Sequence, residues 1–183
     1  MRDAALLGAR LLLGGYMGIH ASQKLLGKFH GPGLDGAGAM FEQAGLVPGR
    51  QMATMAAATE IAGGVLTVTG IASPAGPLAV AGAMSVAAAH NRKGGLMAAR
   101  GGIELPVSYV TLALTLAATG PGRYKLGPSL PAKLTAVGAL AGGALAGALI
   151  AKMVTSTPAG QEDAQEEEPA PAAQPETPVE PTA

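Results

Sequence analysis

Residues 52–71 read MATMAAATEIAGGVLTVTGI, a run in which Glu60 is the single ionisable side chain. At a rise of 1.5 Å per residue, a helix of this length is about 30 Å long, which matches the hydrocarbon core of a bilayer. The run therefore predicts a transmembrane helix that carries one carboxyl group into the membrane.

Four further apolar stretches are bounded by Pro, Gly or clustered charges. They cover about 4–26, the stretch that follows Pro77 and reaches His90, about 103–119 and about 134–154. Only 13% of the 183 residues are charged, against about 25% in soluble domains. Because the alternating pattern of barrel strands is missing, the predicted fold class is an all-α transmembrane helical bundle. Its many Gly and Ala residues suit close helix packing in lipid.

The chain divides by charge and composition. We predict a membrane domain at 1–130 with an interfacial helix at about 35–46, an additional transmembrane helix at 131–155, and a tail at 156–183. All 12 Lys and Arg residues lie within 1–160, whereas seven of the 12 acids lie in 161–183. This Pro-, Ala- and Glu-rich end has too few large apolar residues to form a core, so we expect it to be disordered. A cleaved signal peptide is the alternative for the first stretch, but Arg10 interrupts its apolar run.

Several classes of chemistry are excluded by residue type. The chain has no Cys, so it forms no disulfide, thiolate metal site or covalent c-type haem. It also lacks the common nucleotide-binding and hydrolase motifs, and it has no basic patch interleaved with aromatic residues for nucleic acid. No cofactor is demonstrable from the sequence. The expected partner is the lipid bilayer, with the protein crossing the cell membrane several times.

Helix alternation brings ionisable residues to one side of the predicted bundle. His20, His90 and Glu104 lie at helix ends that share one membrane face, and Glu60 lies about 12 Å below that face at helical rise. Lys24 is one turn from His20, with Gln23 at a neighbouring position. We therefore predict a candidate polar pocket, with the catalytic residues unknown. Its members are His20, Gln23, Lys24, Glu60, His90 and Glu104.

This set has a structural and a functional interpretation. Buried charges cost about 3 kcal/mol each on insertion scales, so they are expected to pair. In the structural interpretation Glu60 pairs with Arg10 or His20, and Glu104 pairs with Lys24 or Arg100. Arg10 is the residue that fits this role best, as a structural intramembrane partner. In the functional interpretation the pocket binds a quinone headgroup or relays a proton.

Two other functional classes have less support. Two His and two carboxylates on four helices are similar to a di-metal bundle, but the Glu-x-x-His repeats of such sites are missing, so no metal site is predicted. A transporter or channel would also explain intramembrane charge, but no inverted repeat is present.

The fifth stretch carries two G-x-x-x-G spacings, Gly138/Gly142 and Gly143/Gly147. This spacing predicts a helix-contact face, either onto the bundle or between protomers of a homo-oligomer. Basic residues number seven on the face of His20 and four on the opposite face, which leaves the membrane orientation open because some of the seven belong to the predicted pocket.

A set of short motifs extends over residues 6–126. Arg10 stands ten residues before His20, which begins HASQKLLG, and the further motifs are GPGLDG at 31–36, FEQAGL at 41–46, EIAGG at 60–64, HN at 90–91, GGIELP at 101–106 and GPGRY at 120–124. In these motifs the chain resembles the DoxX family of small bacterial integral membrane proteins. It departs from the family at Ala21, where Gly is usual, and in its fifth helix and acidic tail.

The resemblance implies a four-helix membrane bundle. Relatives are described as quinone-linked oxidoreductase subunits, notably in thiosulfate oxidation, and others as membrane partners of redox enzymes. We therefore expect an accessory or quinone-interacting subunit of a membrane redox system, with quinone as the candidate cofactor. The alternative is a non-enzymatic membrane scaffold that recruits a soluble redox enzyme, and retention of quinone by the purified protein distinguishes the two.

Overall fold

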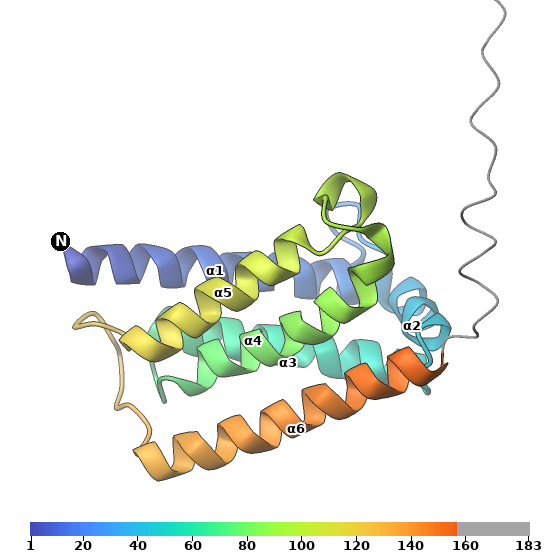
Figure 1. The fold of residues 1–183 in the computed structure, drawn as a ribbon. Helices are drawn as coiled ribbons and strands as arrows, with labels where there is room; N and C mark the ends of the chain where they lie inside the picture. The colour runs from blue at the N-terminus through green and yellow to red at the C-terminus, as the bar shows by residue number, and fades with distance from the viewer. Residues whose placement is uncertain (157–183) are drawn as a thin grey trace, which may run out of the picture.

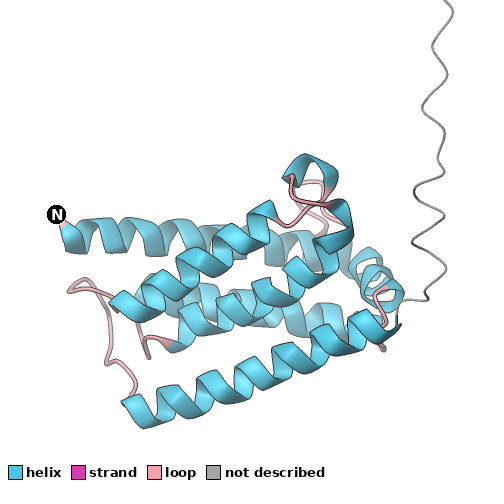
Figure 2. Ribbon diagram, in the orientation of Figure 1, coloured by secondary structure: helices cyan, strands magenta, loops and turns pink. Residues whose placement is uncertain are grey.

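Helices make up 78% of the part of the chain that the computed structural model describes, residues 1–156 (Figure 2). In chain order they are α1 (Arg2–Leu26), α2 (Gly33–Gln43), α3 (Gly49–Thr69), α4 (Ala75–His90), η1 (Asn91–Gly94), η2 (Ala98–Arg100), α5 (Glu104–Thr119) and α6 (Ala132–Ser156), where η denotes a 3₁₀ turn. No strand occurs within these residues. The all-α prediction is confirmed. The predicted acidic tail lies outside the described residues, except for its first position.

Helices α1, α3, α4 and α5 form the bundle, and α6 lies along its outer side against α4 (Figure 1). The main packed pairs are α1 with α3, α3 with α4, and α4 with α5, while α2 packs against α3 at one end. Side chains from α1, α4 and α5 form the buried apolar cluster, which contains Leu13, Met17, Val80, Ala81, Met84, Tyr109, Ala113 and Leu116.

Glycine lets the central helices approach closely. A Cβ atom on Gly14 of α1 would lie 2.8 Å from the carbonyl oxygen of Gly64 on α3, and one on Gly76 of α4 would lie 2.6 Å from the backbone nitrogen of Thr67. Real side chains do not tolerate such contacts. The small-residue composition therefore serves helix packing in the α1–α3 and α3–α4 contacts, as expected where lipid provides no hydrophobic drive between helices.

Within residues 1–156, three helices are long and apolar enough to cross a membrane: α1, α3 and α6. Helix α5 is apolar but has only 16 residues, and α4 has the same length, so each is about 24 Å long at helical rise. Large apolar side chains face outward on α6, including Leu140, which is 75% exposed. This surface suits a lipid environment. The prediction of five spans therefore rests on length and composition for three helices and on bundle topology for the two shorter ones.

The two ends of the bundle carry different connections. One end holds α2, the connection 91–103 and the end of α6, while the opposite end holds the N-terminus and the connection 120–131 (Figure 1). Consecutive bundle helices thus run in alternating directions. This alternation places His20, Lys24, His90 and Glu104 toward the end that carries α2.

Candidate functional site

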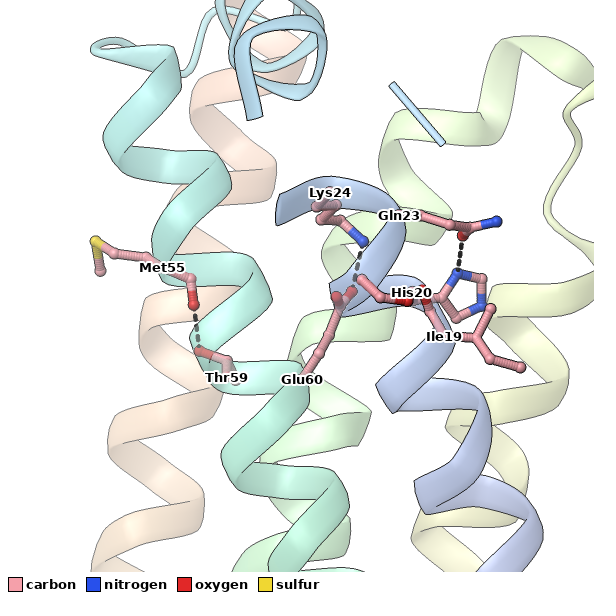
Figure 3. Close-up of polar contacts among 8 residues, drawn as sticks. Ile19, His20, Gln23, Lys24, Met55, Thr59 and Glu60 are labelled. Carbon is pink, nitrogen blue, oxygen red and sulfur yellow. Dashed lines mark hydrogen bonds and ion pairs between the residues drawn. The ribbon is translucent and has the colours of Figure 1, made fainter. Parts of the chain in front are cut away.

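An ion pair joins the last turn of α1 to the middle of α3. The Lys24 ammonium donates a hydrogen bond of 2.7 Å from Nζ to Glu60 Oε1, and the two side chains point toward each other (Figure 3). Glu60 is only 2% exposed and the Lys24 side chain 23%. Because an unpaired charge at this position would be costly, the contact stabilises the packing of α1 against α3.

One oxygen of this pair has no partner. Glu60 Oε2 is buried and accepts no hydrogen bond from any residue in 1–156. Buried polar atoms are nearly always satisfied, so each exception needs an explanation. The Lys24 ammonium has three N–H donors, of which one binds Glu60 Oε1. The pair therefore has both donor and acceptor capacity left for a further polar group.

A second polar pair lies on the same turn of α1. His20 Nδ1 is 3.1 Å from Gln23 Oε1 (Figure 3). Gln23 Nε2 donates to the carbonyl oxygen of Phe29 at 3.3 Å. The imidazole packs edge to face on Tyr109 of α5, with 5.6 Å between ring centroids, and Tyr109 packs on Tyr16 at 5.4 Å. An imidazole and two phenol rings thus meet where α1 crosses α5.

The tyrosines were not among the residues predicted from sequence. Tyr16 precedes His20 by four residues, a spacing that places both on one helical face, so the sequence spacing could have predicted that Tyr16 lies beside His20. No sequence pattern predicts the position of Tyr109, because its contact with His20 depends on how α5 packs against α1. Tyr16 is 40% exposed and Tyr109 is buried, so the cluster extends from the core to the bundle surface.

His90 and Glu104 do not join these pairs. Both are exposed, at the last residue of α4 and the first residue of α5. Glu104 Oε2 accepts a hydrogen bond of 3.0 Å from the Ala98 amide, which satisfies the start of the η2 turn. No ion pair between Glu104 and Lys24 or Arg100 forms within 1–156. The structure therefore brings four of the six predicted residues into two adjacent pairs and leaves the other two at the 91–103 connection.

Arg10 binds backbone carbonyls instead of a carboxylate. Its guanidinium, on a residue only 2% exposed, donates to the carbonyl oxygens of Thr67 at 2.8 Å, Val68 at 2.5 Å, and Pro121 and Tyr124 at 2.6 Å each. The expected pairing of Glu60 with Arg10 or His20 is therefore wrong, since Lys24 takes that place.

The reason is the distance along α3. Thr67 is seven residues beyond Glu60, which is about 10 Å at helical rise, so Arg10 and Glu60 belong to opposite halves of the bundle. The last carbonyls of a helix lack intrahelical donors, and Arg10 supplies donors at the end of α3. Gly70, at φ 70°, ends α3 and lies close beneath the guanidinium, where a Cβ atom would be 2.8 Å from Nη2.

A groove of about 570 Å³ separates the middle of α6 from α4 and α5. The glycines of the two G-x-x-x-G spacings line it, and a Cβ atom on any of them would meet nothing within 4 Å. These are Gly138, Gly142, Gly143 and Gly147. The first alternative, a close contact of these glycines onto the bundle, is therefore wrong. The end of α6 makes the close contacts, through buried Met153 and through Ser156 beside Gly45.

Metal ligands do not gather in the described part of the chain. No group of three or more His, Cys, Asp or Glu residues within 1–156 is placed to hold a metal ion. The polar groups near the α1–α3 contact are instead two hydrogen-bonded pairs beside an aromatic cluster, which suits a ligand with a small polar headgroup and an apolar body.

The fold defines an all-helical membrane bundle with a polar centre between its first helices. Residues 5–91 match the model of the DoxX family of membrane proteins, and this match supports membership of that family. The match extends from α1 to the start of η1 and so contains both polar pairs. No curated protein and no solved structure gives a significant match to the chain.

Proposed function

We propose that this protein is an integral membrane subunit that binds a quinone or quinol headgroup beside the Lys24–Glu60 pair, as an accessory of a membrane redox system. The observation that carries the proposal is Glu60 Oε2, a buried oxygen without a partner in residues 1–156, next to an ammonium with donors left. Ionisable groups inside a membrane are expensive and mark functional sites by default.

The residues fit the chemistry of such a ligand. A quinone carries two carbonyl oxygens, which accept hydrogen bonds, and its quinol form carries two hydroxyls, which also donate them. Lys24 offers donors, while Glu60 Oε2 and the free nitrogen of His20 offer acceptors. The rings of Tyr16 and Tyr109 offer apolar and edge-to-face contacts to a flat headgroup. Because Tyr16 reaches the bundle surface, a ligand dissolved in the bilayer has a lateral approach.

The test is ligand-dependent stability of the purified full-length protein in mild detergent. A short-chain quinone or its quinol should raise the thermal midpoint, because a ligand that binds only the folded state stabilises it. Glu60→Gln should weaken this shift. Asp35→Asn is the matched control. Asp35 is a carboxylate on α2 that is 89% exposed and pairs with Arg50, so its substitution should leave the shift unchanged. If neither form of the ligand moves the wild-type midpoint, the proposal is refuted.

A second candidate is a membrane scaffold that recruits a soluble redox enzyme. It is favoured by the 91–103 connection, which exposes Leu96 and Met97 beside the basic Arg92 and Lys93 at one end of the bundle. Exposed apolar side chains rimmed by charge are typical of protein contacts. Under this function, substitution of Leu96 and Met97 by Ser should abolish co-purification of a redox enzyme, and quinone should not affect thermal stability.

A further inference from the structure

The amide of Gln23 has only one orientation that satisfies its neighbours. On one side it faces the carbonyl oxygen of Phe29, which accepts and cannot donate, so the amide must present Nε2–H there. Its oxygen then faces His20 Nδ1. The opposite orientation would set two oxygens against each other. Phe29 thus determines which atom Gln23 offers to the imidazole.

The loop that supplies this carbonyl is held close to Gln23. Phe29 and His30 have φ values of 51° and 60°, a left-handed conformation that side chains with a Cβ atom rarely adopt. Gly31 packs so tightly on the Gln23 backbone that a Cβ atom there would collide with it. Strained residues of this kind persist only where the surroundings fix them, and here they aim the Phe29 carbonyl at Gln23.

The fixed amide sets the tautomer of His20. Because Gln23 Oε1 can only accept, Nδ1 of the neutral imidazole must carry the proton. Nε2 then has a lone pair and no proton, and no residue within 1–156 donates a hydrogen bond to it. His20 therefore offers an acceptor, beside the two tyrosine rings.

We infer that His20 Nε2 accepts a hydrogen bond from a ligand hydroxyl, so that the site binds a quinol in preference to the corresponding quinone. Gln23 is a positioning residue in this scheme, since it acts only through His20. A quinol hydroxyl can donate to Nε2, whereas a quinone carbonyl faces a lone pair and gains nothing there. The inference rests on the proposed function for the identity of the ligand, but the tautomer of His20 stands without it.

The tautomer is tested first, in the ligand-free protein. ¹⁵N-histidine labelling and NMR in detergent micelles at about pH 8.5, well above the ordinary imidazole pKa of about 6.5, identify the protonated nitrogen of each ring. The chain has three His residues, so His20→Phe assigns the His20 signal by its loss. The expected result is a proton on Nδ1. A proton on Nε2 would overturn the inference.

Ligand preference is then measured at the same pH without oxygen, by titrating a short-chain quinol and its quinone. The wild type should bind the quinol at least about tenfold more tightly, since a hydrogen bond to an otherwise unpaired group is lost with the quinone. His20→Phe and Gln23→Met should bring the ratio toward one. Ser22→Ala is the control on the same turn, because Ser22 Oγ bonds only the Ile19 carbonyl, and it should keep the wild-type ratio.

Each outcome separates the inference from the proposed function. Equal binding of the two forms by the wild type, or an unchanged ratio in His20→Phe, would refute the preference while leaving a quinone site in place. Binding of neither form would refute the proposed function and the preference with it. In that case the NMR spectrum still identifies the tautomer of His20. Because this spectrum is recorded on the wild type, it does not depend on whether Gln23→Met folds.

Discussion

Lys24 Nζ and Glu60 Oε1 lie 2.7 Å apart, and this contact is the ion pair that links α1 to α3 inside the bundle. The second oxygen of Glu60 remains without a partner in the described part of the chain. A carboxylate that is only half satisfied, next to a lysine that retains some exposure, combines a structural contact with free binding capacity.

Removal of Lys24 should destabilise the protein more than removal of both partners. Lys24→Met leaves the Glu60 carboxylate buried and unpaired, which costs about 3–5 kcal/mol in comparable cases. Lys24→Met combined with Glu60→Leu should cost less, because no isolated charge remains. Reversible unfolding in mixed detergent measures these two variants and the single variant Glu60→Leu, and strict additivity of the two single changes would show that the pair contributes no coupling.

Glu60→Gln should be the mildest change at this pair. The amide oxygen of Gln can still accept a hydrogen bond from Lys24, so the α1–α3 contact survives with a weaker, less charge-assisted bond. We expect a loss of about 1 kcal/mol in unfolding free energy. A much larger loss would assign Glu60 to structure alone, since ligand binding could not then be separated from folding.

Arg10→Lys should loosen the end of the bundle opposite to α2. A guanidinium spans the carbonyls at the end of α3 and in the 120–131 connection, whereas an ammonium has three donors on a single atom and cannot reach them all. We expect a loss of about 2–4 kcal/mol, which corresponds to one or two hydrogen bonds to a charged group at about 1.5–3 kcal/mol each. Arg2→Lys is the control on the same helix, since exposed Arg2 makes one long bond of 3.4 Å to Thr119.

A local readout distinguishes this effect from general instability. In the Arg10→Lys background, the Leu126 amide, which donates to the Thr69 carbonyl at 2.9 Å, should exchange with deuterium faster than in the wild type, because the connection is no longer tied to α1. Equal exchange rates together with equal stability would show that the four carbonyl contacts do not hold the connection.

Two glycines should respond in opposite ways to the same substitution. Gly76→Ala places a methyl group against the backbone of α3 at Thr67 and should separate α3 from α4, with a loss of about 1–3 kcal/mol. Gly142→Ala places it in the open groove beside α6 and should leave monomer stability within about 1 kcal/mol of the wild type. Thermal unfolding of the two variants measures the difference.

A larger substitution at Gly142 tests whether a second protomer occupies the groove. If the Gly142 face contacts another copy, Gly142→Leu should lower the oligomeric state in light scattering while the monomer stays folded. An unchanged oligomeric state would mean that these glycines, although aligned at G-x-x-x-G spacing, make no contact between protomers.

The fold class was predictable because it depends on one-dimensional features. A run such as 52–71, which is apolar apart from one acid, forms a helix in lipid because a helix satisfies all of its own backbone hydrogen bonds. The ends of the helix at Gly and Pro follow from the backbone preferences of these two residues. The shared end of His20 and Lys24 was also predictable, because helix alternation and the i, i+4 spacing determine it without tertiary detail.

Side-chain partners were not predictable, because they depend on the register between helices. Whether Glu60 meets Lys24 or Arg10 is decided by how far α1 slides along α3, and Gly14 packing on Gly64 sets that register. The partner of the Glu104 carboxylate was equally unpredictable from the sequence. This partner, the Ala98 amide, is a backbone donor in an irregular connection, and no side-chain pattern in the sequence indicates such a donor.

The last prediction concerns how many helices cross the membrane. Helices α4 and α5, with 16 residues each, fall short of the usual span length. Helix α4 nevertheless packs against α3 and α6, and α5 packs against α4 and α1, in alternating directions. If α1, α3, α4, α5 and α6 all cross, single cysteines at Lys28 and Arg92 should be labelled from one side of sealed vesicles, and a cysteine at Ser129 from the other. The natural chain has no Cys, so each label reports one position. Labelling of Arg92 and Ser129 from the same side would mean that α5 does not span, and release of the protein by alkaline carbonate would refute membrane integration altogether.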